Sequence, residues 1–179
     1  LVKFIKGKHR VKVSMKQLIV DLAQVDDFIK PKNEGDIIFD VDGTLMDISQ
    51  RTHWVQEQPK NWNNFERDMI LDTPRKEIFA IAHEAKKNGH RIIVSSGRNE
   101  RNRDITVLQL NSQGLFPDIM LMRKDDDFRS DDIVKREFLV DLKNKGFNPI
   151  LAVDDRQQVV DMWRDEGVPC FQCVEDGNF

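Results

Sequence analysis

Three acidic residues, Asp40, Asp154 and Asp155, are the first candidates for chemistry in this 179-residue sequence. They follow short apolar runs, so they would lie together if those runs were neighbouring strands. Carboxylates crowded into one place repel one another unless a cation lies between them. An all-oxygen site with no His or Cys nearby favours a hard ion, and Mg²⁺ suits phosphate chemistry. The three residues are therefore candidate Mg²⁺ ligands.

Asp40 opens the segment Asp-Val-Asp-Gly-Thr-Leu, which has the residue types needed for covalent phosphoryl transfer. A carboxylate is a competent nucleophile at phosphorus and forms an aspartyl phosphate. Asp42 could deliver a proton to the leaving oxygen and then activate water for the second step. Gly43 would let the chain turn sharply beside the phosphate. Thr44 would orient Asp42 or donate to the intermediate.

Further along the chain, hydroxyl and basic side chains could donate hydrogen bonds to phosphoryl oxygens. Positioning and charge stabilisation are most of what phosphoryl transfer requires. Asp-x-Asp-Gly alone also occurs in calcium loops and surface turns, and Ser-Gly-Arg is weak alone, but their order along the chain makes coincidence a poor explanation. The candidate substrate-binding set is Ser96, Gly97, Arg98, Arg123, Asp131 and Lys135.

The elements that must position these residues are short apolar runs separated by amphipathic helices. This pattern predicts parallel strands buried on both faces and joined by right-handed crossovers, a doubly wound α/β fold. Its ligand site should lie beyond the carboxyl ends of the strands. The predicted strands are 37–39, 91–95, 118–122, 149–153 and 168–174, and the predicted helices run from a Thr73-Pro74 cap to Gly89, over 101–112, from a Ser130 cap to Gly146, and from Val159 to Gly167.

The first 35 residues differ from the rest and are predicted to be an N-terminal extension, with the α/β domain at 36–179. Residues 2–13 read as a hairpin, and Ser14 is predicted to cap a helix that runs to about Phe28. Residues 1–16 hold six basic residues and no acidic one. This arm would track phosphates or would be the solvated face of the hairpin.

Composition excludes several classes of protein. The net charge of −3 argues against indiscriminate binding of nucleic acid. No apolar run approaches the roughly 20 residues of a membrane span, and no signal-peptide pattern opens the chain. The two cysteines, Cys170 and Cys173, are expected to be ordinary residues in or beside the last strand. A chain without a disulfide framework is expected in a reducing compartment, here the cytoplasm.

The segment Phe39–Leu45 resembles the first motif of the haloacid dehalogenase (HAD) superfamily, with Ser96, Lys135 and Asp154-Asp155 at the positions of the other motifs. More narrowly, residues 36–179 resemble the 3′-phosphatase domain of phage polynucleotide kinase/phosphatase. The stretches that carry this resemblance are Leu151–Arg164, Arg123 with 131–135, and the ending 177–179.

This resemblance implies a HAD-like Rossmannoid enzyme that removes 3′-phosphates from DNA or RNA ends, in the host cytoplasm if a phage encodes it. A kinase or ligase encoded separately would be its partner, since the sequence has no Gly-x-x-x-x-Gly-Lys-Ser/Thr loop of its own. The roles it implies are Asp40 as nucleophile and Mg²⁺ ligand, Asp42 as acid/base and ligand through its backbone carbonyl, Ser96 and Lys135 as phosphoryl binders, Asp154 and Asp155 as metal ligands, and Arg98, Arg123 and Asp131 as further functional residues.

An insert at about 46–73 follows the first motif, where members of the superfamily place a cap. A short cap would admit a polymer end, and His53 and Trp62 would contact the substrate, since aromatic side chains stack on bases. The alternative is that Trp62 only packs a short helix onto the sheet, which is the role expected for Phe65. Met162 and Trp163 are expected in the core.

Two alternatives to the polynucleotide substrate remain at this point. The same chemistry would serve a nucleotidase or a small-molecule phosphatase. A nucleic-acid-binding module on a catalytically idle scaffold is the alternative from another class, and the intact set Asp40, Asp42, Lys135 and Asp154 counts against it. The oligomeric state is left open.

Overall fold

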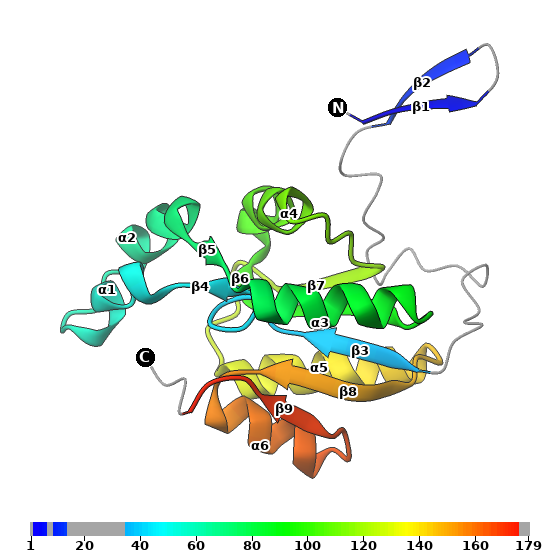
Figure 1. Cartoon of the computed structure of the whole chain (residues 1–179). Helices are drawn as coiled ribbons and strands as arrows, with labels where there is room; N and C mark the ends of the chain where they lie inside the picture. The colour runs from blue at the N-terminus through cyan, green and yellow to red at the C-terminus, as the bar shows by residue number, and fades with distance from the viewer. Residues whose placement is uncertain (1, 7–8, 14–34, 176–179) are drawn as a thin grey trace.

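The computed structural model describes residues 2–6, 9–13 and 35–175. Its centre is a five-stranded sheet with the strand order β7-β6-β3-β8-β9, in which every neighbouring pair is parallel (Figure 1). Strands buried on both faces explain the continuous apolar runs in the sequence. The strands are β3 (Asp36–Phe39), β6 (Arg91–Asn99), β7 (Ile119–Arg123), β8 (Pro149–Asp154) and β9 (Cys170–Gln172).

Helices cover both faces of this sheet, as the doubly wound prediction requires. On one face, α3 (Lys76–Lys87) and α4 (Arg103–Ser112) pack into a core with alternate residues of β3 and β6. On the other face, α5 (Asp131–Asn144) and α6 (Gln157–Asp165) pack with the intervening residues of the same strands. Met162 and Trp163 lie in this second core, as predicted. The predicted fold class is therefore confirmed.

The segment between β3 and α3 forms a small unit beside the sheet (Figure 1). A two-residue antiparallel pair closes its base, and Ile48, Val55 and Phe65 form its own apolar core. Phe65 is a packing residue, as expected, but it packs within this unit and not onto the sheet. Its elements are β4 (Met46–Asp47), η3 (Ser49–Arg51), α1 (His53–Gln56), α2 (Trp62–Arg67), η4 (Asp68–Leu71) and β5 (Thr73–Pro74).

Several predicted boundaries are wrong. Thr73-Pro74 does not cap α3, because both residues pair with β4 and the helix begins after Arg75. The second strand continues to Asn99, so Ser96, Gly97 and Arg98 lie within it, because Asn99 pairs with Arg123 across an irregular register. The last strand is shorter than 168–174, since the amide of Val168 still bonds to the carbonyl of α6 residue Trp163.

At the N-terminus, β1 (Val2–Lys6) and β2 (His9–Val13) pair in antiparallel register, which confirms the predicted hairpin. A short η5 (Glu100–Asn102) precedes α4. The helix predicted from Ser14 and the ending at 177–179 lie outside the described residues. Among the described helices, none has both the length and the apolar character needed to cross a membrane.

Candidate active site

The carboxyl ends of β3 and β8 bring three carboxylates together. Asp40 follows β3, and its amide donates to the carbonyl of Val153 on β8 at 3.0 Å. Asp40, Asp154 and Asp155 each have a carboxylate oxygen within 4.8 Å of the others, and all three side chains are buried. The amide of Asp155 and the indole of Trp163 donate to Asp154, which fixes its orientation. This is the cluster that the strand-end argument predicted.

Lys135 reaches this cluster from α5 and is completely buried. Its ammonium donates to Asp40 Oδ1 at 2.7 Å and to Asp154 Oδ2 at 2.9 Å, and lies 3.3 Å from Asp131 Oδ2, one helical turn earlier. Burial disfavours the charged form, but the three carboxylates outweigh it and raise the pKa of Lys135 well above its usual value. The ammonium is therefore a fixed positive charge beside Asp40.

One ammonium does not neutralise all the carboxylates around it. Burial, together with repulsion from Asp154 and Asp155, raises the pKa of Asp40 well above its usual value despite the opposing charge of Lys135. Burial and the charge of Asp154 raise the pKa of Asp155 to about 7. A divalent cation would relieve this repulsion, and a buried all-oxygen donor set fits Mg²⁺. The residues present therefore fit the predicted metal.

The turn after Asp40 is closely packed against Asp155. Gly43 has φ +86°, and a Cβ there would lie 2.2 Å from Asp155 Oδ2, so only glycine fits. The hydroxyl of Thr44 donates to Asp155 Oδ1 at 3.3 Å, and Thr44 is fully buried. Thr44 therefore orients the acidic pair and not Asp42, which corrects the first of its two predicted roles.

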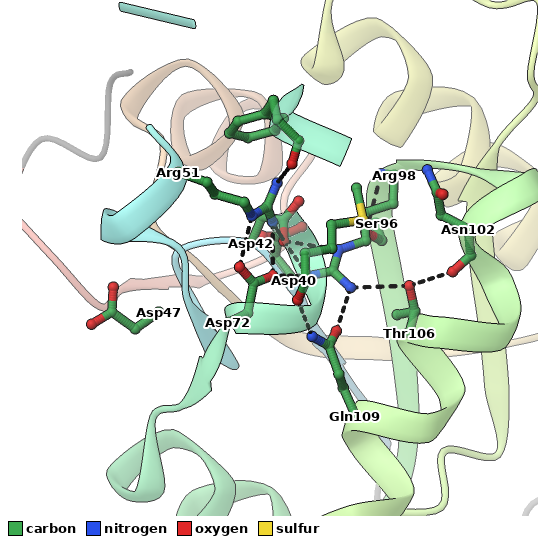
Figure 2. A network of polar contacts seen from close by, with 12 residues as sticks. Asp40, Asp42, Asp47, Arg51, Asp72, Ser96, Arg98, Asn102, Thr106 and Gln109 are labelled. Carbon is green, nitrogen blue, oxygen red and sulfur yellow. Dashed lines mark hydrogen bonds and ion pairs between the residues drawn. The ribbon is translucent and has the colours of Figure 1, made fainter. Parts of the chain in front are cut away.

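Asp42 is held by two guanidinium groups on a single oxygen (Figure 2). Its Oδ1 accepts from Arg51 Nη2 at 2.7 Å, from Arg98 Nε at 2.8 Å and from Arg98 Nη2 at 2.6 Å. Burial alone would raise the pKa of Asp42, but Arg98 and Arg51 outweigh it and lower the pKa. Among the described residues, none donates to Asp42 Oδ2.

Arg98 has no N–H left for a ligand in this arrangement. A guanidinium has five N–H groups. Two of them bond to Asp42, as above, and the others to Asp72 Oδ2 at 2.7 Å, Thr106 Oγ1 at 3.1 Å and Gln109 Oε1 at 2.6 Å. The fully buried side chain of Arg98 therefore connects Asp42 to α4 (Figure 2). The sequence had instead predicted that Arg98 donates to the phosphoryl group.

Arg123 is likewise used within the protein. It donates to the carbonyl of Gly97 at 2.9 Å and to Asp131 Oδ1 at 3.0 Å, and its Nη1 bonds to two carbonyls of the following loop. A Cβ on Gly97 would lie 2.4 Å from Asp131 Oδ1. Asp131 in turn contacts Lys135. These four predicted residues are thus brought together as one connected group beside the carboxylates.

Ser96, His53 and Trp62 complete the predicted set. Ser96 is buried on β6, and its Oγ accepts from the amide of Arg98 at 3.2 Å. His53 and Trp62 lie on the small unit after β4, and their described ring contacts are with its own residues: His53 with Trp54, and Trp62 with Phe65 and Lys60. Trp62 is 53% exposed. Neither residue is joined to the carboxylates by a described contact.

Two residues of the site, Arg51 and Asp72, were not predicted as such. Arg51 is 0% exposed and Asp72 is 8% exposed, although charged side chains are usually exposed and the sequence predicted no role for either of them. Arg51 packs over the ring of Phe65 at 4.1 Å. No spacing in the sequence identifies these two residues as part of the site, because their hydrogen-bond partners include Asp42 and Arg98 of β6. The sequence signal available was only the arginine nine residues after Asp42.

Comparison with known proteins places this site in a family. The model of the family described as "Polynucleotide kinase PNKP phosphatase domain" matches residues 35–179. A chain in the structure of the Pnkp1/Rnl/Hen1 RNA repair complex is 30% identical, with a TM-score of 0.67 over 87% of this chain and 49% of that chain. A chain in a further structure of the Pnkp1/Rnl/Hen1 complex is 29% identical, with a TM-score of 0.67 over 86% of this chain and 51% of that chain.

This chain thus spans about half the length of the chains it matches in those complexes. A hydrolase from Streptococcus pneumoniae TIGR4 is similar in fold alone, at 15% identity and a TM-score of 0.58 over 78% of this chain and 92% of that one. Since the family match covers most of the chain, this chain belongs to the polynucleotide kinase PNKP phosphatase-domain family and is a HAD-type phosphatase domain.

Proposed function

We propose that this chain is a Mg²⁺-dependent phosphomonoesterase that acts through an aspartyl phosphate on Asp40. The observation that carries this proposal is the pairing of Asp40 with a buried ammonium at 2.7 Å, two residues before an acid held by two guanidinium groups. Asp40, Asp154 and Asp155, with the backbone carbonyl of Asp42, would hold Mg²⁺. The bound ion would neutralise the carboxylates and the phosphoryl oxygens.

In the first step, a carboxylate oxygen of Asp40 forms a bond to phosphorus while the bond to the leaving oxygen breaks. Arg51 and Arg98 lower the pKa of Asp42 in the free protein, and the negative charge of the bound phosphoryl group would favour its protonated form. Asp42 then gives its proton to the leaving oxygen, so the product leaves as an alcohol. In the second step, Asp42 takes a proton from water, and the hydroxide displaces Asp40 from phosphorus to release inorganic phosphate. Because Oδ1 of Asp42 accepts three N–H bonds, the transferable proton belongs on Oδ2.

The donors to the phosphoryl oxygens in this proposal are Ser96 and Lys135. Arg98 takes a different role, since all five of its N–H groups are bonded within the protein, and it orients Asp42. Four of the five N–H groups of Arg123 are also bonded within the protein, and it orients Gly97 and Asp131. Asp131 then keeps Lys135 charged and in place. Thr44 and Gly43 set the position of Asp155 beside the nucleophile.

We propose the 3′-phosphate of a DNA or RNA end as the substrate, on the basis of the family match over 35–179. Residues 36–179 would form the phosphatase domain, with 1–35 as an extension and about 46–73 as a short cap. A kinase or ligase domain, encoded separately or beside this chain, would act on the repaired end. The free thiols of Cys170 and Cys173 support the cytoplasm as its compartment.

The substrate proposal is tested by assaying 3′-phosphorylated DNA, 3′-phosphorylated RNA and nucleoside monophosphates side by side with Mg²⁺. We expect the oligonucleotides to exceed the mononucleotides by a wide margin in kcat/KM. Comparable values would identify a nucleotidase or small-molecule phosphatase with the same chemistry. Binding of oligonucleotides without turnover of any ester would identify an idle binding module.

A further inference from the structure

Asp72 is a buried carboxylate that the proposed mechanism does not use. Its Oδ1 accepts from Arg51 Nε at 2.7 Å, and its Oδ2 accepts from Arg51 Nη2 at 2.9 Å, which makes a bidentate pair. Oδ2 also accepts from Arg98 Nη2 at 2.7 Å, and Oδ1 accepts from the side-chain Nε2 of Gln50 at 2.8 Å. The side chain of Asp72 is 0% exposed.

Asp72 therefore binds both of the groups that bind Asp42, without being bonded to Asp42 itself (Figure 2). The four side chains carry two positive and two negative charges, so the buried group is neutral as a whole. Removing one carboxylate would leave two buried guanidinium groups to share the other, and uncompensated buried charge drives rearrangement. Both guanidinium groups would then be free to shift toward or around Asp42.

The connection also spans two parts of the fold. Arg51 and Asp72 lie at opposite ends of the segment between β4 and β5, whereas Arg98 is on β6 and is bonded to Thr106 and Gln109 of α4. Asp72 thus joins the arginine of the small unit to the arginine of the sheet. Proton transfer requires the acid to lie within hydrogen-bond distance of the leaving oxygen, so the rigidity of this connection bears directly on Asp42.

We propose that Asp72 is a positioning residue for leaving-group protonation, which it controls by fixing Arg51 and Arg98 on one oxygen of Asp42. This inference rests on the proposed function, because it assigns Asp42 the proton that the leaving oxygen receives. It makes a specific prediction, since only leaving groups that need a proton depend on that placement. A sugar hydroxyl leaves poorly as an alkoxide, whereas p-nitrophenolate leaves without protonation.

The test compares Asp72→Asn with the wild-type chain on a 3′-phosphorylated oligonucleotide and on p-nitrophenyl phosphate, both with Mg²⁺. The parameter is kcat/KM, which reports the steps up to departure of the leaving group and not the second step. We expect a loss of about 100-fold on the oligonucleotide, the lower range of a general-acid contribution, and of less than about 10-fold on p-nitrophenyl phosphate. Asp42→Asn should show the same selectivity.

Asp36→Asn is the matched control. Asp36 is a buried carboxylate with a bidentate arginine partner, Arg91, at 2.7 and 2.9 Å, but it lies at the other end of β3 from Asp40. Its substitution should lower the thermal midpoint without changing the ratio of the two kcat/KM values. Equal losses on both esters for Asp72→Asn, or no loss on either, would overturn the inference while leaving the proposed function intact.

Should Asp72→Asn fail to fold, Gln109→Leu replaces it. This variant removes the acceptor that holds Arg98 Nη1 at 2.6 Å and leaves all four charges in place. We expect the same selective loss on the oligonucleotide, smaller in size, and a uniform loss would again overturn the inference. A wild-type chain that hydrolyses neither ester would refute the proposed function itself, and the positioning role with it.

Discussion

Any side chain on Gly43 would clash with Asp155, because a Cβ at Gly43 would be 2.2 Å from Asp155 Oδ2. The close approach places the turn after the proposed nucleophile directly against a proposed metal ligand. A substitution at Gly43 would therefore have two effects. It would strain the backbone, which has a positive φ here, and it would displace the carboxylate of Asp155.

Gly43→Ala is expected to abolish phosphatase activity and to lower stability beyond the cost of its backbone conformation. The matched control is Gly89→Ala, since Gly89 has φ +89° but open space where the Cβ would be. Both variants should lose about 1–2 kcal/mol from the left-handed backbone. Only Gly43→Ala should lose activity and Mg²⁺-dependent stabilisation, as measured by thermal denaturation and turnover. Equal behaviour of the two variants would contradict this.

Asp40→Asn is expected to remove turnover and keep the fold. The change deletes the nucleophile but preserves the shape of the side chain. It also removes one negative charge beside Asp154 and Asp155. Acid-quenched reactions with ³²P-labelled substrate should trap a phosphoenzyme in the wild type and none in the variant. Asp47→Asn, which alters an exposed carboxylate on β4, should be fully active. Turnover by Asp40→Asn would refute covalent catalysis at this residue.

Mg²⁺ binding should strengthen as the pH rises through about 7, the pKa of Asp155 in the metal-free protein. Below that pH a proton competes with the cation for Asp155, and above it the carboxylate is ionised. Titration of Mg²⁺ at pH 6 and pH 8 measures the effect, and chelation should stop hydrolysis at both. A pH-independent affinity, or activity in the presence of a chelator, would contradict the carboxylate site.

The same raised pKa predicts how the stability of the metal-free protein depends on pH. Between about 4 and 7 the folded protein keeps a proton on Asp155 that the unfolded chain has lost, so folding stability falls as the pH rises. In a chelator, the thermal midpoint should therefore decrease over this range, less so in Asp155→Asn. Saturating Mg²⁺ should flatten the decrease, because the cation takes the place of the proton.

Trp62→Ala is expected to raise KM for a 3′-phosphorylated oligonucleotide and to leave the kinetics of p-nitrophenyl phosphate unchanged. Trp62 is 53% exposed on α2, and stacking on a base contributes about 1–3 kcal/mol. Trp62→Phe keeps a stacking surface and should retain most of the affinity. A parallel effect on both substrates would show that Trp62 only packs against Phe65.

Deletion of residues 1–16 should weaken oligonucleotide binding in low salt, with a smaller effect as the salt concentration rises. Six basic residues and no acidic one make this arm a source of counterion release. Fluorescence anisotropy across a salt series measures the change in slope. A variant with these lysines and arginines changed to glutamine should reproduce the deletion, and unchanged affinity would make the hairpin structural.

The sequence predicts the sheet and the carboxylate cluster because both depend on local patterns. A short apolar run such as Ile37–Phe39 is typical of a buried strand, and polar residues after parallel strands meet at one edge of the sheet. Asp40, Asp154 and Lys135 were therefore placed together correctly. The end of β6 was predicted wrongly, since the pairing of Asn99 with Arg123 is a tertiary contact.

The arginines show where prediction from sequence fails. Arg98 has the type and position of a phosphate donor, yet its five N–H groups are bonded to acceptors from four other residues. Two of those acceptors lie on α4, and one, Asp72, lies at the end of the insert after the first motif, where the sequence predicted no role for it. Which buried charge meets which is decided by packing between elements, and spacing along the chain carries no record of it.

The bidentate pair of Arg51 and Asp72 joins the two ends of the small unit, and this bears on how related enzymes diversify. Residues 53–64, which include α1 and the start of α2, lie between Arg51 and Asp72 in the sequence and carry His53 and Trp62. Their length and aromatic content could change in evolution, or be exchanged in the laboratory, while Asp42 keeps its environment. Under the proposed function, substrate selectivity and chemistry are separable within one short stretch of chain, and related enzymes would acquire new substrates without rebuilding the reaction.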